Sequence, residues 1–411
     1  MTDPASLLRR MVDDLTADGA LDPSWRETFL AVPRHAFIPD LVWHQERRDL
    51  VPFHRAEDPD RWLRQAYAPK QVLITQVDDG NPVGPGLIGD AISSSASQPN
   101  VVALMLAALE VEPGMTVCEI GTGTGYNAAL LARRLGADHV TTIEIDPTVA
   151  TQARTALCAT GFGAVTMITG DGARGYPPRA PYDRVLSTAA AGQVPYAWVA
   201  QTRPGGRVLT PWGTAYLNGA LLSLAVDEEG TATGRLVDNV AFMWLRDQRL
   251  PWRWVRDCVY DEDNAVVSHT DIHPGRVTDD YHAALAIGLL VPGCEYRYCR
   301  AADDSGKYTV WFLHPASRSW ASLDYTPGAD THEVNQLGPR QLWDEVEAAY
   351  TWWVQAGSPT AAQWRFTVTP QGQQVDLAGR KSTIHESSSI RSKKSASVSC
   401  CHPGKSSQSA M

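Results

Sequence analysis

The sequence predicts an α/β fold in which a mostly parallel sheet is covered by helices on both faces. Residues 115–120 form a short apolar run that leads into a glycine-rich turn, and residues 127–135 continue with leucines at helical spacing. A second strand is expected at 139–145, and it ends in Glu144 and Asp146. The same alternation continues with a strand, a helix and a strand at 183–187, 195–203 and 207–211. Ligands of such a sheet are expected at the carboxyl ends of its strands.

The segments on either side of this unit are predicted to be a helical region and a hairpin. Residues 7–30 are helical in period, and Gly19 divides them into two helices. Residues 221–245 alternate in strand fashion around a D-E-E-G turn at 227–230, which predicts antiparallel strands that close the sheet. The unit is expected to end near Leu250.

Residues 251–378 predict an additional α+β module. Its tryptophans are expected mainly in the core. Helices are expected at 279–287 and at 338–354, the second with Pro339 in its first turn, and strands at 296–299, 308–313, 320–325 and in a hairpin at 366–376. Residues 379–411 are rich in serine and lysine without apolar periodicity, which predicts a disordered tail. The expected domain ranges are 1–80, 81–250, 251–378 and 379–411.

Composition narrows the classes of function. The chain has 411 residues and a net charge of -10, so no basic field favours nucleic acid or an anionic membrane surface. We find neither a signal peptide nor an apolar run of 18 residues, and we expect a cytoplasmic protein. The sequence does not indicate an oligomeric state.

Neither the cysteines nor the histidines predict a metal site. The seven cysteines are an odd number without C-x-x-C spacing, which argues against a disulfide framework and against zinc. The spacing of His269, His273 and His282 fits no common ligand pattern. We therefore expect no metal.

The glycine turn predicts a nucleotide site. Gly121, Gly123 and Gly125 remove side chains where a ligand approaches the backbone. A dinucleotide turn would need a third glycine at position 126, which is Tyr126, so the spacing is G-x-G-x-G. Glu144 ends the next strand, where a carboxylate can accept hydrogen bonds from a ribose.

Three elements together resemble the S-adenosylmethionine-dependent methyltransferases. They are the E-I-G-T-G-T-G turn from Glu119 to Gly125, the acidic Glu144, and the G-D-G run from Gly170 to Gly172. The resemblance implies a Rossmann-like class I methyltransferase fold with S-adenosyl-L-methionine as cofactor. The cofactor-binding residues it implies are Glu119, Gly121, Thr122, Gly123, Gly125, Tyr126, Glu144, Asp146, Asp171 and Gly172. Asp171 would accept a hydrogen bond from the adenine amino group, although a helix or turn cap is the alternative.

Further motifs resemble the protein-L-isoaspartate O-methyltransferase family. They are V-P-R-H-A-F-I-P at 32–39, S-Q-P at 97–99, and the runs at 170–177, 180–190 and 204–213. In that family the loop that ends in S-Q-P lines the substrate site, and a hydroxyl in it touches the carboxylate to be methylated. This implies Ser97 as the first catalytic candidate and Ser95 as the second. The family's G-Q-T-I-S-Q-P is here A-I-S-S-S-A-S-Q-P, so the substrate loop differs where specificity would be set.

The resemblance implies methyl transfer to a side-chain or isoaspartyl carboxylate of a protein or peptide, with a succinimide as the later product. The added module resembles homologues that methylate an aspartate in ribosomally made peptides. A small-molecule methyltransferase is the other enzymatic alternative, whereas S-T-A-A at 187–190 disfavours a base methylase. A non-catalytic peptide-binding protein is a further alternative. We expect the module to guide a peptide to the site, or else to cover an apolar sheet edge.

Overall fold

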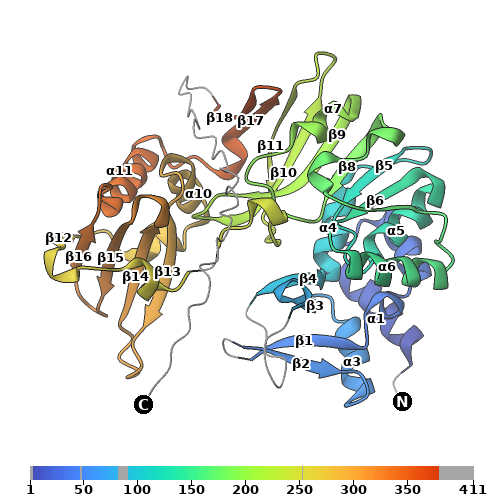
Figure 1. The fold of residues 1–411 in the computed structure, drawn as a ribbon, viewed down its shortest axis with the longest axis horizontal. Coiled ribbons are helices and arrows are strands. Elements are labelled where there is room, and N and C mark those ends of the chain that lie inside the picture. Colours follow the sequence, from blue (N-terminus) through green and yellow to red (C-terminus); the bar gives the residue numbers. More distant parts are fainter. Residues whose placement is uncertain (1–2, 47–48, 82–90, 252, 379–411) are drawn as a thin grey trace, which may run out of the picture.

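The computed structural model describes residues 3–46, 49–81, 91–251 and 253–378. These residues build three sheets, of four, nine and five strands. Figure 1 shows the five-stranded sheet at the left, the large sheet at the upper right and the four-stranded sheet below it. The strand order confirms an α/β fold with a C-terminal α+β part.

The nine-stranded sheet combines a parallel half with an antiparallel half. Strands β7, β6, β5, β8 and β9 are parallel, and β9 is followed by antiparallel neighbours to the other edge. In spatial order the strands are β18 (Gly372–Leu377), β17 (Trp364–Thr369), β11 (Ala232–Asp238), β10 (Asn218–Val226), β9 (Thr202–Gly213), β8 (Tyr182–Ser187), β5 (Val117–Ile120), β6 (Val140–Glu144) and β7 (Thr166–Thr169). All residues of β5 and β6 are buried, as expected for parallel strands covered on both faces.

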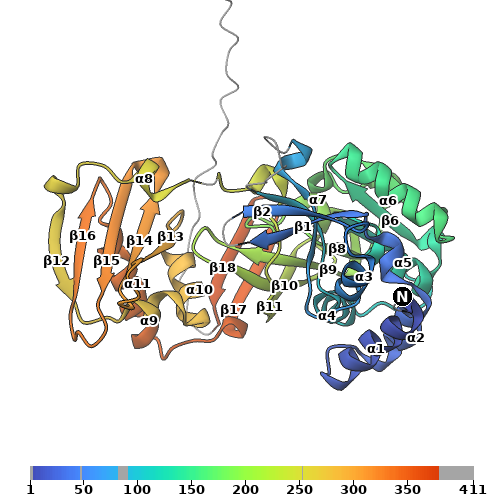
Figure 2. The same cartoon turned by 90° about the horizontal axis from the view of Figure 1, so that it is seen from below.

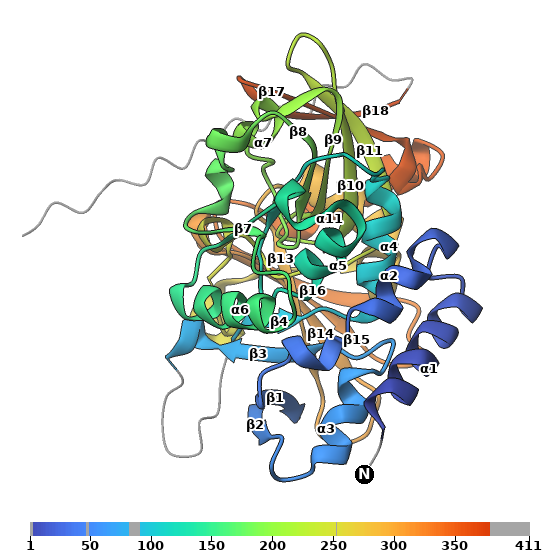
Figure 3. The ribbon, with the colours of Figure 1, turned by 90° about the vertical axis from the view of Figure 1, so that its right-hand side faces the viewer.

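Alternate residues of the strands point to two separate cores. Val117 packs with the helices on one face, whereas Cys118 belongs to the core on the opposite face. The first core is formed with α1 (Pro4–Ala17), α2 (Arg26–Ala31), α4 (Pro99–Leu109) and α5 (Tyr126–Leu135). The second contains Trp198 of α7 (Tyr196–Ala200) and apolar residues of α10 (Tyr281–Leu290). Figure 3 shows α4, α5 and α6 (Pro147–Ala159) around the parallel strands.

The N-terminal region is two helices followed by a small sheet. Helix α1 begins after Asp3, whose carboxylate accepts hydrogen bonds from two backbone N–H groups, and the chain breaks near Gly19 as expected. The sheet has the order β2-β1-β3-β4, with β1 (Leu41–Glu46), β2 (Asp49–His54), β3 (Leu73–Val77) and β4 (Ile92–Ala96), and α3 (Pro59–Ala66) precedes β3. The serine-rich stretch that we expected as a loop is therefore largely strand β4. Its run of serines lacks the β-branched and aromatic residues that are enriched in strands, so the sequence did not indicate one.

The C-terminal region forms the five-stranded sheet and also extends the large one. Figure 2 shows the five-stranded sheet beside the large sheet, with β17 and β18 lying with the latter. Its elements are α8 (Val255–Cys258), β12 (Val266–Thr270), α9 (Pro274–Thr278), α10, β13 (Glu295–Arg300), β14 (Tyr308–His314), β15 (Ser319–Tyr325), β16 (His332–Leu337) and α11 (Leu342–Gln355). Strands β12 and β16 were not foreseen, and Pro339 lies before α11 rather than in its first turn.

The hairpin β17–β18 pairs with β11 of the large sheet, so one region of the chain serves two sheets.

The expectation that the tryptophans of residues 251–378 lie mainly in the core is confirmed at several positions. Fully buried indoles occur at Trp320, Trp343 and Trp364, whereas Trp254 is exposed.

The tail, the cysteines and the search for membrane spans and metal-binding groups complete the description. The proposed disordered tail, 379–411, lies outside the described residues. The five cysteines within the described ranges are free thiols. In the part of the chain that the structure describes, we find no helix with the length and hydropathy of a membrane span, and no group of three or more His, Cys, Asp or Glu side chains that could hold a metal ion.

Candidate active site

A cavity of about 690 Å³ lies at the carboxyl ends of β5, β6 and β8. This size is within the range of about 300–1,000 Å³ that is usual for small-molecule sites. Its wall is built from the glycine turn, from β4 with the residues that follow it, and from residues 239–249. We call residues 239–249 the strap.

The glycine turn connects β5 to α5, and its three glycines, Gly121, Gly123 and Gly125, all have positive φ. A Cβ atom on Gly121 would lie 2.6 Å from Thr188 Oγ1, so this position has no room for a side chain. A Cβ atom on Gly123 would meet only the Ser95 carbonyl oxygen, at 3.5 Å. Gly123 therefore presents bare backbone to the space between the turn and β4.

Glu144 lies in the cavity wall at the end of β6. Its Oε2 accepts the Gly123 N–H at 2.9 Å, and its Oε1 accepts the Asp146 N–H at 3.1 Å. Burial raises the pKa of this carboxyl. Each oxygen keeps a further lone pair, so Glu144 can accept hydrogen bonds from ligand hydroxyls.

Glu119 lies behind the glycine turn and does not line the cavity. It is fully buried, and it accepts hydrogen bonds from Asn127 Nδ2 and from Thr142 Oγ1, both at 2.6 Å. Burial raises the pKa of Glu119 to about 7. The contacts point to a brace that joins α5 to β6, and cofactor binding by Glu119 would have to be indirect.

Gly125 and Asp146 also lie outside the cavity wall. Gly125 precedes α5 with φ 87°, and a Cβ atom there would come within 3.3 Å of Leu157 of α6. Asp146 caps α6 by accepting the N–H groups of Thr148 and Val149. The remaining cofactor candidates, Thr122, Tyr126, Asp171 and Gly172, do line the cavity.

Asp171 caps a turn and also lies in the cavity wall, where the predicted contact with adenine stays a prediction. Its Oδ1 accepts the Ala173 N–H at 2.9 Å, which caps a short 3₁₀ turn, and its Oδ2 pairs with Arg174 at 3.5 Å. The residue also faces the cavity. Gly172 beside it has no room for a side chain, because a Cβ atom would lie 2.4 Å from Ile120 Cγ2.

The catalytic candidates Ser95 and Ser97 both line the cavity. Within the described ranges their hydroxyls make no hydrogen bond. By contrast, Ser93 Oγ donates to Gln76 Oε1 at 2.9 Å, and Ser94 Oγ accepts from Thr75 at 3.1 Å. The hydroxyls of Ser95 and Ser97 are therefore available to a ligand.

Arg34, from the V-P-R-H motif, contacts residues 93–97, the serine segment, from the side away from the cavity. It is fully buried, and its guanidinium donates to the carbonyl oxygens of Ala96 at 3.2 Å and Ser97 at 2.9 Å, as well as to Ala66. Desolvation lowers the pKa of Arg34 to about 10. The V-P-R-H motif thus supplies a positioning residue for Ser97. Its charge in an otherwise apolar run was the available signal.

The strap was not predicted from the sequence, because the pattern of residues 221–245 predicted one hairpin. Strand β11 instead ends at Asp238, and the chain then crosses the carboxyl ends of the parallel strands. Ala190 after β8 donates to the Met243 carbonyl at 2.7 Å and accepts from the Leu245 N–H at 2.8 Å. Gln248 accepts the Gly192 N–H at 2.8 Å.

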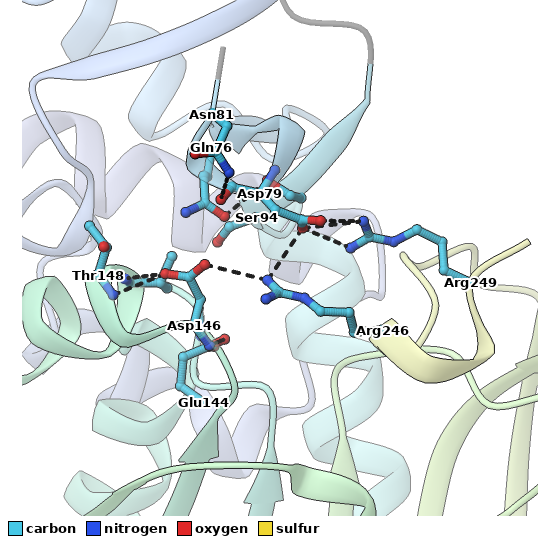
Figure 4. Close-up of polar contacts among 12 residues, drawn as sticks. Gln76, Asp79, Asn81, Ser94, Glu144, Asp146, Thr148, Arg246 and Arg249 are labelled. Carbon is cyan, nitrogen blue, oxygen red and sulfur yellow. Dashed lines mark hydrogen bonds and ion pairs between the residues drawn. The ribbon is translucent and has the colours of Figure 1, made fainter. Parts of the chain in front are cut away.

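Two arginines of the strap form ion pairs with carboxylates outside it (Figure 4). Arg246 lies 3.4 Å from Asp146 and 3.3 Å from Asp79. Arg249 contacts both carboxylate oxygens of Asp79, at 3.0 and 3.2 Å. Asp79 follows β3, so these ion pairs connect the N-terminal sheet, the strap and the start of α6.

The cavity wall contains buried polar atoms without a protein partner. Asn100 Oδ1 and Arg246 Nε are both buried, and neither is hydrogen bonded within the described residues. A buried group of this kind costs about 1–3 kcal/mol unless a ligand or water satisfies it. Together with the bare backbone of Gly123 and the acceptors of Glu144, these atoms fit a polar nucleoside-containing ligand.

Comparison with known proteins gives the family. The family model for protein-L-isoaspartate(D-aspartate) O-methyltransferase matches residues 64–250. The protein-L-isoaspartate O-methyltransferase of Ignicoccus hospitalis is 35% identical over 205 residues, which cover 49% of this chain and 80% of that protein. The enzyme named protein-L-isoaspartate O-methyltransferase 2 of a Polaromonas species is 34% identical over 249 residues, 61% of this chain and all of that protein.

The chain belongs to the protein-L-isoaspartate O-methyltransferase family.

A solved structure of a protein-L-isoaspartate O-methyltransferase supports the fold with a TM-score of 0.51, covering 90% of this chain and 99% of that one at 19% identity. The family match ends at Leu250, so it includes the glycine turn, the serine segment and the whole strap. The five-stranded sheet and the hairpin β17–β18 lie beyond that match.

Proposed function

We propose that this protein is an S-adenosylmethionine-dependent O-methyltransferase that esterifies an isoaspartyl or aspartyl carboxylate in a protein or peptide. Membership of the family indicates the type of reaction, which is methyl transfer to a carboxylate. The arrangement of the cavity supports it, because Glu144 and the bare Gly123 backbone lie on one side and the unpaired hydroxyls of Ser95 and Ser97 on the other.

The residues of the cavity have separable tasks in this proposal. Glu144 accepts hydrogen bonds from the ribose, and Asp171 accepts one from the adenine. Ser97, with Ser95 in support, donates to the carboxylate and orients it without a full positive charge that would weaken the nucleophile. The strap covers the cavity and limits the access of water to the reacting charges.

The reaction needs positioning rather than a general base. A side-chain carboxylate has a reference pKa of about 4 and is ionised at pH 7. When bound, S-adenosylmethionine supplies an electrophilic methyl group that such an anion can take directly. Arg34 contributes by fixing the carbonyl groups on either side of the Ser97 amide, so that the hydroxyl-bearing segment keeps its position.

The test is methyl transfer from labelled S-adenosylmethionine to a synthetic isoaspartyl peptide and to the same peptide with aspartate. A third peptide, in which the carboxylate is replaced by an amide, is the control. We expect base-labile label in the carboxylate peptides only. Label in the amide peptide, or cofactor binding without transfer to any carboxylate, would contradict the proposal.

A finer proposal concerns the source of the carboxylate. A dedicated precursor peptide from a biosynthetic cluster is favoured by the altered A-I-S-S-S-A-S-Q-P segment and by the region after Leu250. Repair of damaged proteins requires little sequence preference, whereas a dedicated enzyme should turn over one long peptide far better than short isoaspartyl peptides. A cytoplasmic location is a prediction from the sequence alone, and a small-molecule substrate is the alternative to a peptide or protein.

A further inference from the structure

Positive charge in the cavity wall is confined to one place. Among the described residues that line the cavity, Arg246 and Arg249 are the arginine or lysine side chains. Both belong to the strap, and about a third of each side chain is exposed, 30% and 31% respectively. The chain as a whole carries a net charge of -10, so within the described cavity wall the charges that attract an acidic substrate are those of the strap.

The partner of these arginines is a carboxylate from the chain itself. Asp79 accepts two contacts from Arg249 Nη1 and one from Nη2, at 3.0 to 3.2 Å, in the forked geometry typical of arginine with a carboxylate. The Asp79 side chain is 37% exposed, so water and other carboxylates can compete for the same guanidinium. In Figure 4 Asp79 and the two arginines face one another across the gap between the N-terminal sheet and the strap.

Asp79 is held close to the serine segment, and its backbone has the left-handed conformation with φ 51°. Its N–H donates to Ser93 Oγ at 3.1 Å, in the same strand that carries Ser95. The arginines therefore reach a carboxylate that is connected directly to the segment where the target carboxylate should lie.

The contacts of Arg246 are weaker than those of Arg249. Arg246 Nη2 makes one contact to Asp79 at 3.3 Å and one to Asp146 at 3.4 Å. Ion-paired hydrogen bonds of arginine are usually about 2.7–2.9 Å. A second acidic group would thus compete with long contacts at Arg246.

We propose that Arg249 and Arg246 determine substrate specificity by binding an acidic side chain that neighbours the target carboxylate, and that Asp79 occupies their place until the peptide binds. This inference rests on the proposed function and names its substrate class, an acidic peptide segment. The target carboxylate itself is bound by the hydroxyls of Ser97 and Ser95, because an ion pair with a guanidinium would make this carboxylate a weaker nucleophile. Asp79 then acts as an internal competitor.

The main alternative is that the ion pairs only fasten the strap. The two hypotheses predict opposite changes in peptide affinity for one substitution, Asp79→Asn. If Asp79 competes with the substrate, Asp79→Asn frees Arg249 and improves binding of acidic peptides. If Asp79 only fastens the strap, Asp79→Asn loosens the cavity and weakens binding of every peptide to a similar degree.

The experiment uses the full chain and two peptides with the same isoaspartyl target, one flanked by glutamates and one by glutamines. KM and kcat are measured for the parent protein, Arg249→Gln, Arg249→Lys, Asp79→Asn and the exposed control Arg10→Gln. Peptide affinity is measured in parallel by calorimetry in the presence of S-adenosylhomocysteine.

We expect the parent protein to have a KM at least 10-fold lower for the glutamate peptide. Arg249→Gln should abolish that preference, because KM for the glutamate peptide should rise to about the value for the glutamine peptide. Arg249→Lys should keep part of the preference, because lysine retains the charge without the fork. Asp79→Asn should lower KM for the glutamate peptide about 3-fold, and Arg10→Gln should match the parent.

Three outcomes would overturn the inference. They are equal KM values for the two peptides in the parent protein, an equal rise of KM for both peptides in Arg249→Gln, and an equal rise for both in Asp79→Asn. If Arg249→Gln does not fold, the calorimetric preference of Arg249→Lys and Asp79→Asn decides. Methylation of neither peptide, with cofactor still bound, would instead contradict the proposed function.

Discussion

The two walls of the cavity differ in how the chain builds them. The wall that we assign to the cofactor comes mainly from one continuous stretch, 117–146, in which β5, the glycine turn, α5 and β6 follow one another. The opposite wall is assembled from β4, the strap and the buried Arg34, which are far apart in sequence. The first wall is set by local backbone geometry, and the second by contacts between distant segments. Substitutions should therefore affect the walls separately.

The largest expected effect is on the cofactor wall alone. Gly123→Val should abolish detectable binding of S-adenosylmethionine, a loss of at least about 1,000-fold or 4 kcal/mol. The valine side chain would project into the space between the turn and Ser95, and it would have to adopt φ 53°. Gly114→Val is the matched control, since Gly114 also has positive φ but lies in open space outside the cavity. Calorimetry measures the affinity, and unchanged affinity in Gly123→Val would contradict the assignment.

The second largest effect is expected for Arg34, which supports the opposite wall of the cavity. Arg34→Met removes the guanidinium that donates to the carbonyl oxygens of Ala96 and Ser97, which should lower the free energy of unfolding by about 2–4 kcal/mol. Turnover should fall further than cofactor affinity, because Ser97 loses its support. Denaturant unfolding and cofactor titration separate the two quantities, and Arg34→Lys should be intermediate in both. An equal loss of cofactor affinity and turnover would show that the walls are not independent.

A smaller effect is expected for the carboxylate at the end of β6. Glu144→Ala should weaken cofactor binding by about 1.5–3 kcal/mol, the usual value of hydrogen bonds to a charged acceptor. The accompanying loss of its bonds to the Gly123 and Asp146 N–H groups makes Glu144→Gln a necessary comparison. Equal affinities in all three proteins would refute the ribose contact.

The brace behind the glycine turn predicts a pH dependence of stability. Burial raises the pKa of Glu119 from 4.5 to about 7, so its protonated form is favoured in the folded state. Its stabilising contribution is complete below pH 4.5 and is lost as the pH rises through about 7. Glu119→Gln removes this titration, and its melting temperature should fall less than that of the parent between pH 5 and 8. Parallel melting curves for the two proteins across this range would contradict the raised pKa.

The smallest expected effect concerns the region beyond the family match. If this region guides a peptide, Trp254→Ala should leave cofactor affinity unchanged and reduce turnover of a long peptide a few-fold, because Trp254 is 43% exposed. Short isoaspartyl peptides should be affected less. A chain ending at Leu250 is a poorer test, because it removes Trp364 and Phe366 from the core of the large sheet and should be insoluble. Unaltered turnover on both substrates in Trp254→Ala would leave sheet coverage as the role of the region.

The difference between the walls also explains what sequence reasoning could provide. The glycine turn, Glu144 and the alternation of strands and helices are local patterns, and each was predicted at nearly its observed position. The strap was not, because its role depends on hydrogen bonds to Ala190 and Gly192 rather than on its own periodicity. Glu119 shows a further limit: the motif that contains it was recognised, but which side of the turn its carboxylate faces depends on Asn127 and Thr142.

The position of β17 and β18 has a consequence for synthesis of the chain. Strand β11 is made early, but its outer partner β17 follows only after residues 239–363. At ribosomal rates of about 5–20 residues per second, this interval lasts roughly 6–25 s. During that time β11 is an unpaired edge, with Trp212 lacking the Phe366 ring that packs against it at 4.9 Å. The nascent protein must therefore tolerate, or have shielded, an open sheet edge until its last described strands emerge.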